Sequence, residues 1–184
     1  WGLLDSDELI ETFAIDLDKE YAKELAELIN SFNNSGLNYV YESSGLMVAE
    51  KYRGQGIAKY LLSLAIEKAR DLGIAICGVV HTQNVASMST FFSLGFQLRA
   101  IWHMSENYDF VYLLKNCEKD DVNGEELILK KVLQSQINGD KIKNIMEVIN
   151  TDTKEHSALL SKGYVGIGCR NNLLYFSKKG ELKL

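Results

Sequence analysis

Residues 46–73, LMVAEKYRGQGIAKYLLSLAIEKARDLG, contain the most distinctive motif of the chain. Their pattern predicts a strand, a turn that contains Gly54 and Gly56, and a helix that stops at Gly73. Glycine has no Cβ, so the turn backbone can approach a bulky anion closely. The first amides of a helix have no intrahelical acceptor, and the helix dipole adds partial positive charge there. The turn therefore predicts a pyrophosphate site, with Lys59 as a nearby cation.

The spacing of this turn separates it from two common nucleotide-binding loops. It lacks both the G-x-G-x-x-G and the G-x-x-x-x-G-K-[ST] spacing. It resembles instead the Arg/Gln-x-x-Gly-x-Gly/Ala motif of the GNAT superfamily of N-acetyltransferases, with Arg53, Gly56 and Ala58 in the three defining places. Three downstream residues also match that family: Asn84, Gly95 and Phe96.

The resemblance extends over about residues 39–114 and implies a fold class. That class is α/β (α+β), the GNAT fold, in which helices flank a mixed, twisted sheet with splayed central strands. Leu46–Val48 would be the splayed central strand. A GNAT acetyl-CoA-binding domain is implied at residues 1–117. The chain offers little room for the family's N-terminal strands, so either these strands preceded Trp1 or the protein is a shortened variant.

Residues 118–184 are expected to form a small C-terminal α/β extension or a degenerate second GNAT half-domain. The polar run at 116–124 marks the boundary. The half-domain interpretation comes from a faint echo: SKGY at 161–164 resembles SLGF at 93–96, and each follows a predicted helix and precedes two predicted strands. Both interpretations stay open.

Hydrophobic periodicity predicts the other elements. Helical spacing predicts four helices: 5–33 with a cap at Asp16 or Asp18, one after Asn84 up to Leu94, one from Lys141 that includes Ile149, and 153–163. Alternating or apolar runs predict strands: 37–42, 74–80, 96–104, 108–114, 127–133, 164–167 and 173–177.

Composition limits the partners. The net charge is −5 and no basic stripe is present, which argues against nucleic acid. No apolar run approaches the roughly 18 to 20 residues of a membrane span, and no secretory signal is visible, so we expect neither membrane nor secretion. Three cysteines without metal-ligand spacing indicate reduced thiols in the cytoplasm and no metal. A homodimer is the assembly expected.

The family resemblance implies acetyl-CoA as donor and a primary amine of a small molecule, peptide or protein as acceptor. The pyrophosphate would lie on the amides of Arg53–Ala58, and the pantetheine arm would pair with the backbone of Val48. Asn84 is either a pantetheine contact or a plain helix cap. The cofactor-binding residues implied are Met47, Val48, Arg53, Gly54, Gln55, Gly56, Ile57, Ala58, Lys59, Asn84 and Phe91.

Acetyl transfer also needs a base, because a primary amine with a pKa near 10 is mostly protonated at neutral pH. Glu42 is the first candidate, six residues before Val48, where some family members place a catalytic glutamate. His81 is the second, since an ordinary histidine pKa of about 6.5 suits proton transfer. A solvated glutamate and a structural histidine are the plain alternatives.

Phe91 is where the sequence departs from the family. It stands seven residues after Asn84, where many members carry a tyrosine near the CoA sulfur, and phenylalanine donates no proton. The acid would then be Ser87, Ser89, Tyr108 or water. The sequence therefore predicts an acetyl-CoA-dependent N-acetyltransferase, with a catalytically weak or inactive acyl-CoA-binding regulatory module as the alternative.

Overall fold

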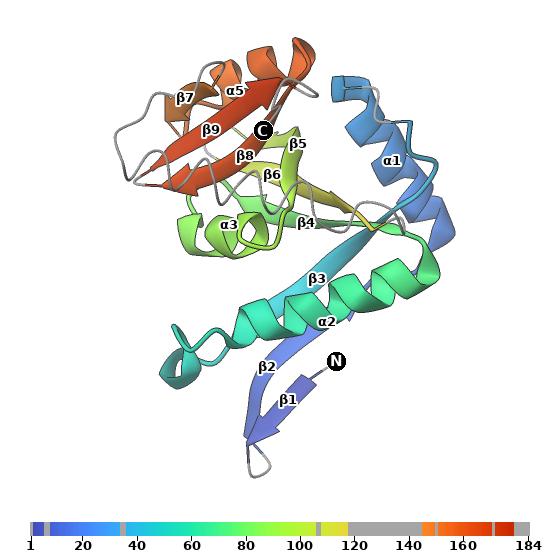
Figure 1. The fold of residues 1–184 in the computed structure, drawn as a ribbon, viewed down its shortest axis with the longest axis vertical. Helices are drawn as coiled ribbons and strands as arrows, with labels where there is room; N and C mark the ends of the chain where they lie inside the picture. The colour runs from blue at the N-terminus through green and yellow to red at the C-terminus, as the bar shows by residue number, and fades with distance from the viewer. Residues whose placement is uncertain are drawn as a thin grey trace.

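The structure is a computed structural model that describes residues 2–5, 8–33, 36–105, 108–117, 145–149, 151–170 and 172–178 (Figure 1). The described strands form one nine-stranded sheet in the order β1-β2-β3-β4-β6-β5-β8-β9-β7. The strands are β1 (Gly2–Asp5), β2 (Glu8–Ile15), β3 (Val40–Val48), β4 (Ala75–His81), β5 (Gln97–Ser105), β6 (Tyr108–Asn116), β7 (Ile145–Ile149), β8 (Tyr164–Arg170) and β9 (Leu173–Lys178). The helices are α1 (Lys19–Asn33), α2 (Ile57–Leu72), α3 (Val85–Phe92), α5 (Thr153–Ser161) and the short 3-10 helix η1 (Glu50–Tyr52). The predicted mixed sheet is confirmed, since β3 and β4 pair in parallel and the other described pairs are antiparallel.

The N-terminal prediction is half wrong. Residues 5–33 do not form one helix, because Glu8–Ile15 is strand β2, which pairs antiparallel with β3 and with β1. Helix α1 begins only at Lys19, after Asp18, whose Oδ1 accepts a hydrogen bond from the Tyr21 amide at 2.9 Å. The backbone bonds of a sheet come from distant residues, and the helical spacing of the sequence could not reveal them.

The central strand β3 contains a kink that separates it from its neighbour. The sequence predicted two pieces, 37–42 and 46–48, but the structure has one strand, Val40–Val48. Gly45 has φ +67°, the β2–β3 register shifts nearby, and the Thr12 hydroxyl donates to the Gly45 carbonyl at 2.7 Å. Such an irregularity bends and twists a strand. Among the described residues, β3 and β4 pair only from Val40–Ser43 to Ala75–Gly78, so the two strands diverge beyond that point.

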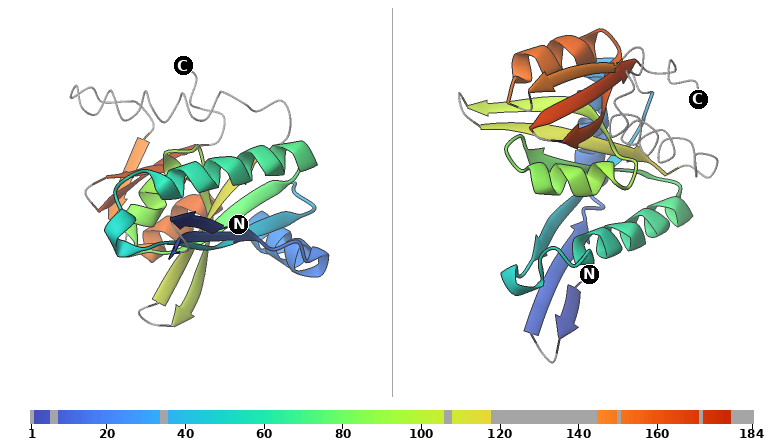
Figure 2. Two further views of the ribbon diagram at one scale, coloured as in Figure 1. Left: turned by 90° about the horizontal axis from the view of Figure 1, so that it is seen from below. Right: turned by 60° about the vertical axis from the view of Figure 1, so that its left-hand side comes forward.

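Alternate residues of the central strands enter two apolar clusters on the two faces of the sheet. Ala75 and Cys77 join the cluster that α1 covers, while Ile76 joins the larger cluster that contains α2 and α3. Helices α1 and α2 accordingly lie on different sides of the sheet (Figure 2). The groove described below is thus framed by α2 and α3.

The tail continues the same sheet. The predicted helix from Lys141 through Ile149 is wrong for its described part, because Ile145–Ile149 is strand β7, paired antiparallel with β9. Residues 127–133 and 140–144, also assigned from periodicity, lie outside the described residues. The predicted helix at 153–163 and its two following strands are confirmed as α5, β8 and β9.

Among the described residues, one strand pairing joins the tail to the rest of the sheet. Leu98 of β5 pairs with Gly166 of β8. A Cβ at Gly166 would lie 2.7 Å from the Leu98 Cβ, so the two backbones meet only because residue 166 is glycine. Buried residues of α5, β8 and β9 belong to the same core cluster as those of α2 and α3. The division at residues 117 and 118 remains a prediction.

Candidate active site

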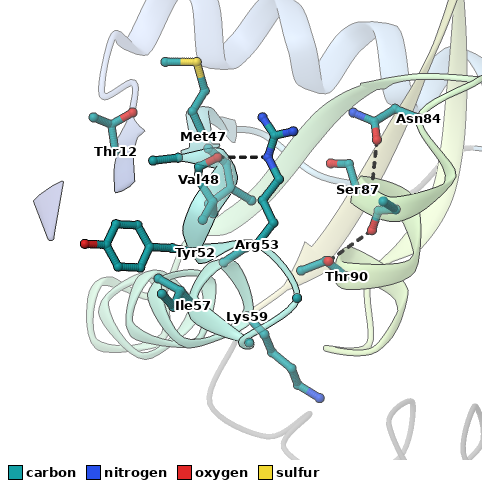
Figure 3. Close-up of a pocket in the computed structure, with 16 residues that line it drawn as sticks. Thr12, Met47, Val48, Tyr52, Arg53, Ile57, Lys59, Asn84, Ser87 and Thr90 are labelled. Carbon is teal, nitrogen blue, oxygen red and sulfur yellow. Dashed lines mark hydrogen bonds between the residues drawn. The ribbon is translucent and has the colours of Figure 1, made fainter. Parts of the chain in front are cut away.

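A groove of about 810 Å³ opens where β3 and β4 diverge. One wall is the end of β3 with the turn into α2, and the other is the start of α3 (Figure 3). Nine of the predicted cofactor-binding residues line it: Met47, Val48, Arg53, Gly54, Gly56, Ile57, Ala58, Lys59 and Asn84. The other lining residues are Thr12, Leu46, Ala49, Tyr52, Ala86, Ser87 and Thr90.

The turn before α2 presents its backbone to this groove. Gly54 and Gly56 have φ +75° and +80°, and an added Cβ at either would have nothing within 4 Å. Left-handed backbone of this kind strains any residue with a Cβ. Gly56 is the N-cap of α2, and within the described part of the chain no side chain caps this helix. The first amides of α2 are therefore available to an anion at the groove.

Arg53 lies across the groove. Its Nε donates to the Val48 carbonyl at 3.1 Å. The guanidinium stands between the end of β3 and the side of α3 that carries Asn84 and Ser87 (Figure 3). Gln55, by contrast, donates to the Lys51 carbonyl at 3.3 Å and is not among the lining residues.

Asn84 is both a cap and a lining residue. Its Oδ1 accepts from the Ser87 amide at 3.1 Å and so starts α3. Ser87 and Thr90 follow on the side of the helix that faces the groove. Sequence reasoning missed Thr12 because β2 was taken for a helix, and missed Thr90, although its spacing of three from Ser87 places those two residues on one helix face.

Phe91 does not reach the groove. Its side chain is 3% exposed, and its ring meets the Phe96 ring at 4.9 Å, edge to face. A Cβ at Gly78 would lie 2.3 Å from the Phe91 ring, so the ring packs directly on strand β4. The predicted placement of Phe91 against the cofactor is therefore corrected. It is a core residue, because the face of α3 that points at the sheet differs from the face that lines the groove.

Glu42 lies on β3 beneath α1, and it is not among the groove-lining residues. The Tyr21 hydroxyl of α1 donates a hydrogen bond to Glu42 Oε2. Burial raises the pKa of Tyr21, and the bond to the Glu42 carboxylate raises it further. Burial likewise raises the pKa of Tyr112 to about 12, with added effects from Cys77 and Glu42. The Glu42 carboxylate is thus held by one oxygen in a cluster of protonated groups.

His81 ends β4 between two aromatic rings, with ring centroids 5.2 Å from Tyr108 and 5.5 Å from Phe110. Its Nδ1 accepts from the Gln83 amide at 3.2 Å, so a neutral ring carries its proton on Nε2. Nε2 is buried and has no hydrogen-bond partner among the described residues. In this tautomer His81 offers a donor rather than a base. It also does not line the groove.

The described residues contain no group of three or more His, Cys, Asp or Glu side chains that could hold a metal ion. In the described part of the chain, no helix has both the length and the apolar character needed to cross a membrane.

Residues 4–96, about half of the chain, match the model of the acetyltransferase (GNAT) family. The chain therefore belongs to the GNAT family of acetyltransferases. No curated protein matches it.

Several solved structures of low sequence identity align with part of this chain. Arabidopsis thaliana NAA60 with a bisubstrate analogue has 20% identity and a TM-score of 0.49, over 60% of this chain and 66% of that one. The same protein with acetyl-CoA has 19% identity and a TM-score of 0.49, over 60% of this chain and 67% of that one. The ribosomal-protein-S18-alanine N-acetyltransferase of Escherichia coli has 16% identity and a TM-score of 0.48, over 67% of this chain and 71% of that one. The chain thus spans about two thirds of the length of these structures.

Proposed function

We propose that this protein is an acetyl-CoA-dependent N-acetyltransferase that acetylates a primary amine of a small molecule, a peptide or a protein. One observation carries the proposal. The turn of Gly54 and Gly56 opens its uncapped amides into a groove at the divergence of β3 and β4, inside the region that matches the acetyltransferase family.

The residues of the groove fit such a donor. The α2 amides and the Arg53 guanidinium suit a diphosphate, and Lys59 adds charge at the entrance of the helix. The backbone of Val48 suits the amides of an extended arm, because β3 has no partner from β4 at that point among the described residues. When bound, acetyl-CoA would supply the activated acetyl thioester.

Glu42 is the base in this proposal. Tyr21 occupies Oε2 of its carboxylate, which leaves Oε1 to accept a proton from the ammonium form of the acceptor. Glu42 lies on the α1 face of the sheet, so the acceptor would approach from that face while the donor lies in the groove. The His81 tautomer makes this residue a hydrogen-bond donor, and we assign it no proton abstraction.

The decisive experiment is a calorimetric titration with acetyl-CoA, followed by a panel of amines and amino-terminal peptides assayed for CoA release by chromatography. We expect micromolar binding and turnover with at least one acceptor. Glu42→Gln should keep donor binding and lower turnover by about 100-fold or more. Glu67→Gln is the matched control, because Glu67 is exposed on α2, does not line the groove and should change neither.

Each outcome has one meaning. No binding by folded protein would refute the proposal. Binding without turnover on any acceptor would leave the acyl-CoA-binding module that the sequence offered as alternative. The proposal also includes a cytoplasmic homodimer with no nucleic-acid or membrane partner, for which size-exclusion chromatography with light scattering tests the assembly.

A further inference from the structure

The Arg53 side chain occupies the backbone acceptor that the donor arm would use. Arg53 Nε donates to the carbonyl oxygen of Val48 at 3.1 Å, and both residues line the groove. In Figure 3 the side chain rises from the turn and its guanidinium lies between Val48 and the Asn84 side of α3. The Val48 carbonyl at the end of β3 is therefore already a hydrogen-bond acceptor for this residue.

Val48 matters because of where β3 is unpaired. It is the last residue of β3, five residues past the last pairing with β4 at Ser43. On its other side it is paired with Glu11 of β2. An extended ligand can add to such an unpaired strand edge through main-chain hydrogen bonds. Any arm with amide groups must compete with Arg53 for the Val48 carbonyl.

The same side chain starts from the turn that would hold a diphosphate. Arg53 directly precedes Gly54, whose backbone belongs to the anion-binding turn before α2. A guanidinium gains the attraction of opposite charges at a phosphate oxygen, which a neutral carbonyl does not offer. A diphosphate at the turn would therefore draw the guanidinium away from Val48.

We propose that Arg53 is a specificity-determining residue that lets a pantetheine thioester bind the groove more tightly when a diphosphate occupies the turn. This inference rests on the proposed function of the groove. With no diphosphate present, Arg53 holds the Val48 carbonyl and weakens the binding of shorter pantetheine compounds. With a diphosphate, Arg53 turns to the anion and releases the carbonyl to the arm.

Lys59 provides a natural contrast. It also lines the groove, but its side chain points away from Arg53 and Val48 (Figure 3). No hydrogen bond or ion pair of its ammonium is found among the described residues. Lys59 can add attraction for phosphate, and it has no means of blocking the Val48 carbonyl.

The test measures the affinities of acetyl-CoA and S-acetylpantetheine for the wild type, Arg53→Ala and Lys59→Ala, by calorimetry and by NMR titration for weak binding. We expect Arg53→Ala to weaken acetyl-CoA by about tenfold and to strengthen S-acetylpantetheine by about threefold. Lys59→Ala should weaken acetyl-CoA and leave S-acetylpantetheine unchanged. An Arg53→Ala variant that weakens both ligands, or leaves the shorter one unchanged, overturns the inference.

A second readout needs no thioester turnover. The Nε–H signal of Arg53, identified by its loss in Arg53→Ala, should shift when inorganic pyrophosphate is added. Pyrophosphate should also tighten S-acetylpantetheine binding by the wild type about threefold and have no such effect on Arg53→Ala. If the wild type binds neither thioester, the proposed function itself fails. If it binds acetyl-CoA without these opposed effects, only the role of Arg53 fails.

Discussion

Two parts of this sheet are built in the same way, and the groove lies beside the first of them. The first is β4–α3–β5–β6 and the second is β7–α5–β8–β9. Their strand orders, β4-β6-β5 and β8-β9-β7, mirror one another across the β5–β8 contact. Each helix starts at a side-chain cap, Asn84 in the first unit and Asp152 in the second, and each is followed by a glycine of positive φ.

The spacing of the two units is constant. Asn84 and Asp152 are 68 residues apart, and so are Gly95 and Gly163. Leu98 and Gly166 are again 68 residues apart, and they pair with each other where the two units meet. Origin of the tail as a second half-domain remains a prediction, and this common spacing is the observation that supports it.

The two units differ in what their first strands pair with. The first strand of the first unit, β4, pairs with β3, which then diverges and leads into the uncapped start of α2. The first strand of the second unit, β7, pairs only with β9 among the described residues. A strand, capped helix and hairpin therefore supply one wall of this groove, and the elements that precede β4 supply the other.

The largest expected effect is at the junction of the units. Gly166→Val places a side chain 2.7 Å from the Leu98 Cβ, on a strand that cannot move without breaking the sheet. We expect a loss of about 3 kcal/mol in the free energy of unfolding, measured by urea denaturation. Arg170→Val on the exposed end of β8 is the control and should change stability by less than about 0.5 kcal/mol. Equal effects would mean that the junction is not tightly packed.

The next effect concerns a bond that ties the second unit to the first. The Thr153 hydroxyl donates to Asp109 Oδ2 at 2.6 Å. Burial of Asp109 opposes ionisation, but the bonds from Thr153 and His103 outweigh it and lower the pKa of Asp109. Thr153→Val should cost about 1.5 kcal/mol at pH 7, and Thr153→Ser should restore most of it.

This bond also has a defined pH dependence. Because the folded pKa of Asp109 lies below its unfolded value, its stabilisation is present above the unfolded pKa of about 3.8 and is lost as pH falls through the folded value. The wild type and Thr153→Val should therefore converge in stability in strong acid. A constant difference at every pH would contradict an ionised acceptor.

The two helix caps, Asn84 and Asp152, occupy equivalent positions but differ in whether they reach the groove. Asn84→Ala and Asp152→Ala each remove a bond at 3.1 Å to the amide three residues later, and each should cost about 1 kcal/mol in thermal or urea unfolding. Only Asn84 lines the groove, so only Asn84→Ala should also weaken acetyl-CoA, by about threefold. Equal effects on binding would show that helix stability, not contact, controls affinity.

The last prediction concerns two buried residues at equivalent positions of the two units, Met88 and His156. His156 Nε2 lies 2.9 Å from the Ile149 carbonyl, and Nδ1 has no partner among the described residues. Burial lowers the pKa of His156, although the Ile149 carbonyl and nearby carboxylates oppose the shift. The stabilisation that the neutral His156 ring gives to the folded state is therefore complete above the unfolded pKa of about 6.5. It is lost as pH falls toward the lower folded pKa.

His156→Met, which copies the first unit, should remove this pH dependence. From pH 8 to pH 5 the stability of the wild type relative to the variant should fall by about 1 kcal/mol or less, measured by urea unfolding at both pH values. A difference that stays constant between the two pH values would mean that His156 is not neutral in the folded protein.

Predictions from the sequence succeeded where the cause is local. The turn at Gly54 and Gly56, the stop at Gly73 and the cap at Asp18 all depend on bonds within a few residues, and the structure has each of them. They failed at Glu8–Ile15 and Ile145–Ile149, where a short apolar pattern suits a helix or a strand equally well. Pairing with β3 and with β9 decided both, and these partners are distant in sequence.

The same distinction between local and long-range causes applies to the candidate site. The sequence was sufficient to predict the glycine turn before α2, because glycine conformation and free helix amides are properties of a few consecutive residues. Only the tertiary structure placed Phe91 in the core, Glu42 beneath Tyr21 and Arg53 on the Val48 carbonyl. Each of these contacts depends on how far β3 diverges from β4 and on which face of a helix meets the sheet. Long-range strand pairing sets both, and no local pattern in the chain encodes it.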